Sequence, residues 1–149
     1  MKPFYNIDQA KRRNYFTMSQ FHYHEYEEIY YLMSGQRYYY IEDSRYLVKK
    51  GSLLFINKYD IHKTVDSVNP NHERIVLYFN DDFIDHHHGT YKDLLLSPFN
   101  LANKQIELNL QEQSYVEQLL FQMIREKENS QLAGRELFFA SLTAQLLLY

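Results

Sequence analysis

The stretch FHYHEYEEIYYLMSG, residues 21 to 35, places two histidines one residue apart and follows them with a glutamate and a glycine. An extended strand puts residues i and i+2 on one face, so the side chains of His22 and His24 should point the same way. Two imidazoles at this spacing can reach one ion at about 2.0–2.1 Å. A bend after His24 would bring Glu28 under the same site, and Tyr30 would then face inward as well. The stretch alone also suits a half-exposed strand whose imidazoles bond to backbone or tyrosine groups.

The composition is that of a folded single domain. The chain has 149 residues, of which 45% are apolar, and a net charge of −3. Cysteine is absent, which excludes disulfide scaffolds, cysteine-based zinc modules and thiol nucleophiles. The charges are interspersed, so a basic face for DNA is not expected on this chain alone. The sequence shows no apolar run of transmembrane length and no signal peptide, so we expect no membrane contact and a cytoplasmic location.

Hydrophobic alternation predicts six or seven short strands between Asn14 and about Asn80. The segments are rich in tyrosine and isoleucine, and Gly35 with Gln36 forms a tight turn between two of them. Strands at this spacing are typical of a sandwich or a small barrel. The tyrosine runs of residues 30–31 and 38–40 send alternate rings to opposite faces. One face could stack on a sugar, or both could be ordinary core and surface of the sheet.

The pattern changes to helix after these strands. Residues 81–97 read as one or two short helical pieces, and residues 104–110 as one more strand. Asn109 and Glu112 fit a capping box at the start of a long helix. A second helix runs from about Arg135 to the end and is apolar nearly all round, so it should be buried or face a partner.

Two further motifs have simple interpretations. The run HHHG, residues 86–89, is predicted to be a helix end with exposed imidazoles, because adjacent helical residues do not face each other. The basic run of residues 11–13 is predicted to be a solvated N-terminal arm rather than a phosphate site. No glycine-rich phosphate loop and no G-x-S-x-G sequence is present, so nucleotide and acyl-transfer chemistry have no support.

The spacing H-x-H-x-x-x-E-x-x-x-x-x-x-G, from His22 to Gly35, resembles the first motif of the cupin superfamily. The second cupin motif has a glycine, a Pro-x-Gly turn, a histidine and an asparagine, and its spacing is matched from Gly51 through His62. The resemblance covers about residues 15–79. The chain departs from the motifs where glycine, proline, glycine and asparagine are replaced by Phe16, Asn57, Tyr59 and Asp66.

In cupin enzymes the matching positions hold a transition metal. The resemblance therefore implies a ligand set suited to Zn, Ni, Mn or Fe, made of His22, His24, Glu28 and His62. An enzyme of this kind, such as a dioxygenase or a sugar isomerase, is the alternative function.

A narrower resemblance is to the N-terminal sensing domain of AraC-type transcription regulators. It rests on the histidine-bearing strand, the E-I-x-Y segment from Glu28, the strand after Gly51 with its turn and His62, and the two helices that follow. The fold implied is mainly β with C-terminal helices. A cupin-like double-stranded β-helix, or jelly-roll barrel, would span residues 1–110, and an antiparallel helical pair residues 111–149.

The regulator resemblance implies a binding domain rather than an enzyme. Its barrel would bind a small-molecule effector, such as a sugar, with no cofactor expected, through His22, His24, Glu28, Tyr30 and His62. The C-terminal helices would form a homodimer by burying either the opposite face or Leu137, Phe138, Leu142 and Leu146. DNA would be bound by a helix-turn-helix domain that this chain lacks. The final helix ends at Tyr149 with no stop signal, which fits a fragment of a longer protein. A third hypothesis for the function is a purely structural dimerisation domain with an empty barrel.

Overall fold

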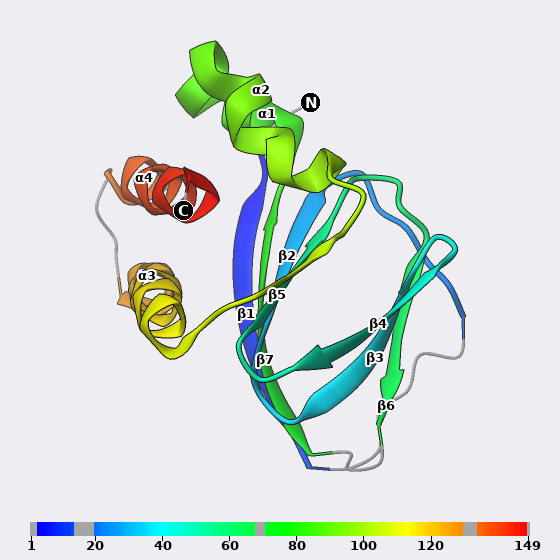
Figure 1. Cartoon of the computed structure of the whole chain (residues 1–149). Helices are drawn as coiled ribbons and strands as arrows, with labels where there is room; N and C mark the ends of the chain where they lie inside the picture. The colour runs from blue at the N-terminus through cyan, green and yellow to red at the C-terminus, as the bar shows by residue number, and fades with distance from the viewer. Residues whose placement is uncertain (1–2, 14–19, 68–70, 130–133, 149) are drawn as a thin grey trace.

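The computed structural model describes residues 3–13, 20–67, 71–129 and 134–148. The strands in these ranges are β1 Tyr5–Arg12, β2 Glu27–Ser34, β3 Gln36–Ile41, β4 Ser44–Lys49, β5 Ser52–Ile56, β6 His62–Asp66, β7 His72–Phe79 and β8 Gln105–Glu107. The helices are α1 Asp81–His88, η1 Gly89–Tyr91, α2 Lys92–Leu96, η2 Ser97–Asn100, α3 Leu110–Asn129 and α4 Arg135–Leu148 (Figure 1).

The strands form two antiparallel sheets that face each other (Figure 1). The larger sheet has the order β1-β7-β2-β5-β8 and the smaller the order β4-β3-β6. The chain passes from one sheet to the other at Gly35, whose φ is +91°. A Cβ there would lie 2.3 Å from the carbonyl oxygen of Asn71, so the turn requires glycine. The mainly β architecture followed by helices confirms the predicted fold class.

Strand β2 is buried on both faces. Ile29 and Tyr31 point outward into the hydrophobic core beneath the helices. Tyr30 and Leu32 point inward and pack in the second core, between the two sheets. Side chains alternate along a strand, so the near-continuous apolar run of β2 reflects two different sets of neighbours. The strand therefore joins the space between the sheets to the helical layer.

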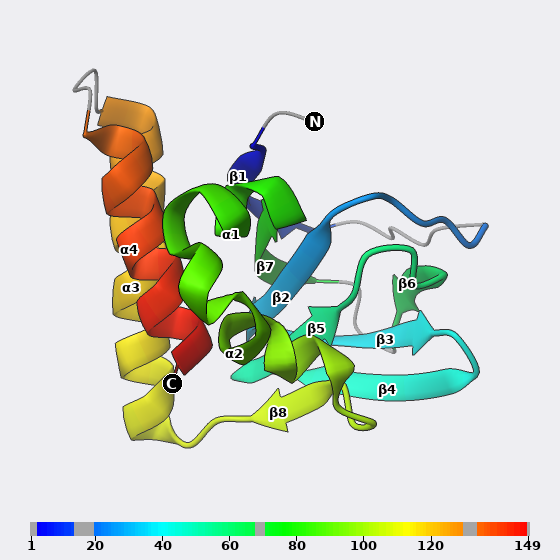
Figure 2. The ribbon, with the colours of Figure 1, turned by 90° about the horizontal axis from the view of Figure 1, so that it is seen from above.

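The helices cover the outer face of the larger sheet. Helices α3 and α4 lie side by side there, and α1 with α2 closes one end of the sheet (Figures 1 and 2). Helix α3 begins at the predicted capping box. The Glu112 N–H donates to Asn109 Oδ1 at 2.8 Å, and the Asn109 N–H donates to Glu112 Oε1 at 3.0 Å. No helix in the described part of the chain has the length and hydropathy that a membrane span needs.

Helix α4 divides its apolar residues between the core and the surface. Leu142 and Leu146 are buried against the chain's own core. Leu137 and Phe138 are 64% and 43% exposed. Of the four residues predicted to pair with a partner on one face, two are therefore already used within the chain.

The histidine run of α1 differs from its prediction. His86 is exposed, as expected. The His87 Nε2 lies 3.1 Å from Glu136 Oε1, and the His88 Nε2 lies 2.9 Å from the carbonyl oxygen of Ala140. The prediction that all three imidazoles are exposed was wrong, because α4 packs against α1 and supplies acceptors to two of them.

A buried carboxyl group, Glu27, connects the start of β2 to α1. The Lys58 backbone N–H donates to Glu27 Oε2 at 2.7 Å, and the Lys58 ammonium pairs with Asp81 at the start of α1. Burial raises the pKa of Glu27 to about 8, and its hydrogen bond to Asp81 adds to this. Burial alone would raise the pKa of Asp81, but the hydrogen bonds from Glu27 and Lys58 outweigh this effect and lower that pKa. Lys92 also faces Asp81, at 3.8 Å. Glu27 is therefore protonated at neutral pH and donates to an ionised Asp81.

The Glu27 proton predicts a pH-dependent stability. The folded chain keeps the proton up to about pH 8, whereas the unfolded chain loses it near pH 4.5, so unfolding releases a proton between these values. The contribution of Glu27 to the free energy of unfolding is therefore present at low pH and lost as pH rises. Glu27→Gln keeps the donor and the acceptor without titrating. We expect the stability of Glu27→Gln relative to wild type to rise between pH 5.5 and 8, by at most about 1.4 kcal/mol per pH unit.

Urea denaturation at several pH values measures this difference, and subtracting the wild type removes the titration of all other groups. Glu107→Gln, on an exposed position of β8, is the control and should show a constant difference. An equally constant difference for Glu27→Gln would contradict a buried proton at Glu27.

Candidate functional site

A single antiparallel bridge holds His22 beside His62. Each backbone N–H donates to the carbonyl of the other residue, at 3.0 and 2.9 Å. The two imidazole centroids lie 4.2 Å apart, and that of His24 lies 4.9 Å from His62 and 5.9 Å from His22. The strand predicted from residue 14 onward is only this bridge at His22, and residues 14–19 lie outside the described part. The sequence correctly placed His22 and His24 toward one point.

Glu28 reaches the same point from β2. Its Oε1 lies 3.2 Å from His24 Nε2 and 3.9 Å from His62 Nε2. The Tyr39 hydroxyl, on the facing sheet, donates to Glu28 Oε2 at 2.9 Å. The structure thus brings together the four residues that the cupin spacing singled out. We call this group, His22, His24, Glu28 and His62, the histidine end.

The imidazoles are oriented as metal ligands are. His62 Nδ1 lies 2.8 Å from the Asp60 carbonyl and donates to it, so in the neutral ring Nε2 is the nitrogen that can bind a metal. That Nε2 is buried and makes no hydrogen bond. His24 Nδ1 likewise faces the Tyr26 carbonyl, at 3.3 Å, and its Nε2 faces the Glu28 carboxylate. The Nε2 atoms of His24 and His62 therefore both point toward Glu28 Oε1.

The residues at the histidine end fit a transition-metal ion. One ring nitrogen from each of His22, His24 and His62 lies within 4.8 Å of the others. Burial lowers the pKa of His22, and the neighbouring His62 and His24 lower it further, which favours the neutral imidazole that binds metals. Three imidazoles with one carboxylate suit Zn, Ni, Mn or Fe.

The Tyr30 side chain lies between the two sheets and lines the space between them. Its ring lies 5.1 Å from that of Tyr39, edge to face. Burial raises the pKa of Tyr30 to about 12, although the charges of Arg37 and Arg74 oppose this. The hydroxyl is therefore neutral and can donate. Tyr30 lies on the same face of β2 as Glu28, as the sequence predicted, and its role in binding stays a prediction.

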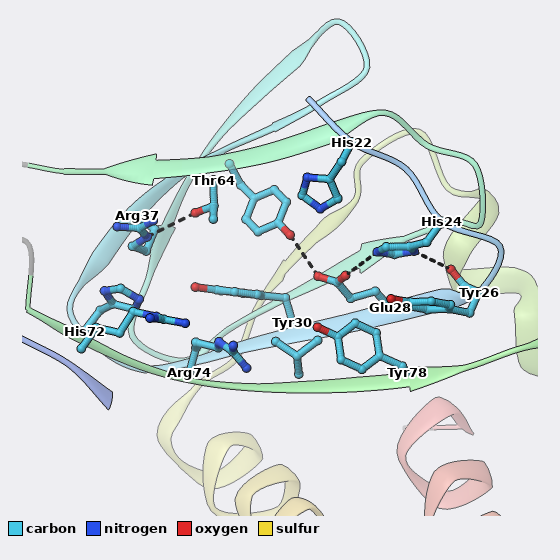
Figure 3. A pocket seen from close by; sticks show the side chains of 13 residues that line it. His22, His24, Tyr26, Glu28, Tyr30, Arg37, Thr64, His72, Arg74 and Tyr78 are labelled. Carbon is cyan, nitrogen blue, oxygen red and sulfur yellow. Dashed lines mark hydrogen bonds and ion pairs between the residues drawn. The ribbon is translucent and has the colours of Figure 1, made fainter. Parts of the chain in front are cut away.

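A cavity of about 240 Å³ extends from the histidine end along Tyr30. Its far part is lined by Arg37, His72 and Arg74 (Figure 3). Arg12, which pairs with His72 across β1 and β7, also lines the cavity, and we call these four residues the arginine end. Thr64 lies between the ends and accepts from Arg37 Nε at 3.2 Å. The cavity is therefore polar at both ends, with aromatic rings in the middle.

Sequence reasoning did not find the arginine end. Arg74 lies two and four residues before Val76 and Tyr78, so a period of two would have placed all three on one face. Arg37 is likewise two residues before Tyr39. In the basic run of residues 11–13, Lys11 and Arg13 are exposed as predicted, but Arg12 belongs to β1 and lines the cavity.

The turn before His62 departs from the cupin motif in sequence but keeps a tight geometry. Tyr59, at the motif's glycine position, has a φ of +67°. Asn57, at the proline position, accepts the Lys58 N–H at 3.0 Å through its side chain. Its own N–H donates to Asp60 Oδ2 at 3.0 Å. Side-chain hydrogen bonds hold the turn in place of proline, and Tyr59 takes a backbone conformation that glycine adopts more readily.

Solved structures with a similar fold include the apo form of a ToxT variant from Vibrio cholerae. It shares 13% identity, with a TM-score of 0.56. The match covers 97% of this chain and 54% of that one, so the chain spans about half the length of ToxT. KdgF from Halomonas shares 18% identity over 50% of this chain and 67% of its own, with a TM-score of 0.45. A cupin 2 conserved barrel domain protein from Salinispora arenicola shares 15% identity over 55% and 68%, with a TM-score of 0.47.

No curated protein matches the chain. The model of the AraC-like ligand binding domain matches residues 6–147, which include the strands, the histidine end and both long helices. A match over nearly the whole chain covers the barrel and the helical layer together. The chain therefore belongs to the AraC-like ligand-binding domain family.

Proposed function

We propose that this chain senses a small-molecule effector as part of a bacterial AraC-type transcription regulator in the cytoplasm, and that it is not an enzyme. The observation that carries the proposal is the cavity of about 240 Å³ between the sheets, in a chain that a ligand-binding family matches from residue 6 to 147. Concave sites with a few convergent polar groups are the usual places for small ligands. The effector would contact His22, His24, Glu28, Tyr30 and His62.

Strand β2 offers a physical route from the effector to the helices. Tyr30 faces the cavity, and the next residue, Tyr31, faces α3. The Tyr31 hydroxyl donates to Glu117 Oε2 of α3 at 2.6 Å. An effector that binds one conformation of β2 more tightly than another shifts the population toward that conformation. Because Tyr31 is hydrogen-bonded to α3, the placement of α3 would change with it. DNA binding would be altered through a domain that lies outside this chain.

The cavity predicts which residue limits the size of the effector. Val76 lies on β7 in the middle of the cavity and is buried. Val76→Phe should fill this space and weaken binding of the effector about tenfold or more, at a cost to stability of about 1–3 kcal/mol. The probes are D-glucose, D-galactose and their uronate and phosphate derivatives, measured by calorimetry. Leu101→Ala, at an exposed position after η2 and outside the cavity, should bind as the wild type does.

Binding that is unchanged in Val76→Phe would place the effector outside the cavity. Circular dichroism of each variant verifies that the fold is retained. If none of these probes binds the wild type, the sugar class is excluded.

The exposed part of α4 supports a homodimer. Leu137 and Phe138 are exposed apolar residues on α4, and such residues are typical of contact surfaces. We expect a dimer in sedimentation velocity, and Leu137→Glu should weaken it at least about tenfold by placing a charge in the contact. Leu101→Glu, at another exposed apolar position after η2, is the control. A wild-type chain that stays monomeric at high concentration would contradict the dimer.

A metal-dependent cupin enzyme is the second candidate, favoured by one observation. The ring nitrogens of three histidines converge beside Glu28, and the Nε2 of His62 is buried without a hydrogen bond. A bound metal would be held by His22, His24, His62 and Glu28 and would supply Lewis-acid chemistry. Tyr39 would orient Glu28, and the Asp60 carbonyl would orient His62.

Titration with Zn²⁺ and Ni²⁺ tests this candidate. A metal site predicts one ion per chain, with binding weakened at least about tenfold in His62→Ala. His86→Ala, an exposed position of α1, should leave binding unchanged. A protein purified without an affinity tag that binds neither ion, and carries no iron or manganese, would exclude the metal enzyme.

A further inference from the structure

The register of the strands places three rows of side chains across the cavity. Along β2 and β7 the paired residues are Glu28 with Tyr78, Tyr30 with Val76, and Leu32 with Arg74. On the smaller sheet they are Ile41 with His62, Tyr39 with Thr64, and Arg37 with Asp66. The first row carries the histidine end and the third the arginine end. Four residues of strand, about 13 Å, separate the backbones of these rows.

Three guanidinium groups line the arginine end of the cavity. Arg37 is 0% exposed and pairs with Asp66. Arg74 pairs with Asp8 at 3.0 Å, and Arg12 also lines the cavity. Arg37 and Arg74 thus each face one carboxylate. One of the two, Asp8, has a side chain 51% exposed to water, and exposed ion pairs are weak, so a ligand anion can compete for Arg74.

One hydrogen-bond donor lies beside these charges. The Tyr30 hydroxyl points toward Arg37 and His72 (Figure 3). The Tyr30 side chain is buried, and its hydroxyl can donate a hydrogen bond inside the cavity. A buried phenol between guanidinium groups suits a planar carboxylate or a tetrahedral phosphate, which accept several hydrogen bonds at once. Among the described residues, the histidine end carries the Glu28 carboxylate and no guanidinium group, so it suits the neutral part of a ligand.

We propose that the effector is a compact anion that carries a carboxylate or phosphate group at one end and neutral oxygen atoms at the other. The anionic group binds at the arginine end, between Arg37 and Arg74, and the neutral oxygens face the histidine end. This inference rests on the proposed sensing function and narrows its ligand class. The volume of about 240 Å³ is below the roughly 300–1,000 Å³ of most ligand pockets, which favours a molecule of about monosaccharide size.

Matched pairs of probes test the charge of the ligand. Calorimetry with the full chain compares D-glucuronate or D-glucose 6-phosphate with D-glucose, and D-galacturonate with D-galactose. Thermal unfolding compares inorganic phosphate with chloride at equal ionic strength. We expect the anion of at least one sugar pair to bind about tenfold or more tightly than its neutral partner. We also expect phosphate to raise the melting temperature more than chloride does.

Variants at Arg74 locate the binding. Arg74→Gln removes the charge and should abolish both preferences, whereas Arg74→Lys keeps the charge and should retain part of them. Arg125→Gln removes an exposed charge on α3, outside the cavity, and should change neither. If Arg74→Gln does not fold, the weakened preference in Arg74→Lys still tests the site.

Each result decides between the inference and the proposed function. Equal binding of neutral and anionic sugars overturns the anionic ligand and leaves effector sensing intact. A preference for anions that survives in the Arg74 variants overturns the site. A response to phosphate that depends on Arg74, without binding of any sugar or sugar acid, supports the anion site and contradicts a sugar-derived effector. If neither phosphate nor any sugar acid binds, the inference fails.

Discussion

The two buried faces of β2 are the constraint on which the rest of the structure depends. A shift of one residue in its pairing would move every side chain to the opposite face, so the register is strongly fixed. Glu28 and Tyr30 must then face the space between the sheets, and Ile29 and Tyr31 the helices. The cavity and the helical layer are therefore two sides of one strand.

The histidine end could be predicted from the sequence because its signals are local. Two histidines separated by one residue share a face wherever the chain is extended, and the spacing from Gly51 to His62 fixed the third. The arginine end depends on contacts between distant segments. Arg37 and Arg74 line one cavity because β3 and β7 belong to two sheets that face each other, and nothing within either segment shows which face turns inward.

The helices show the same division between local and distant determinants. The capping box of Asn109 and Glu112 spans four residues, so the start of α3 was predicted and is confirmed. Helix α4 is apolar nearly all round, so its sequence could not distinguish a face against the sheet from a face toward solvent. The bonds from His87 and His88 to α4 could not be predicted either, because they require the packing of two helices separated by about 50 residues.

The departures from the cupin motif have a physical meaning in this structure. Asp66 stands where the motif has asparagine, and it pairs with the buried Arg37. A buried ion pair costs desolvation that its attraction only partly offsets, so stability alone is a weak reason to keep one. The ligand-type residues of the motif are retained at one end of the cavity, while the replaced position neutralises a guanidinium at the other. We infer that the exchange of asparagine for Asp66 belongs with the arginine end, because a buried arginine needs a carboxylate partner when the cavity holds no anion.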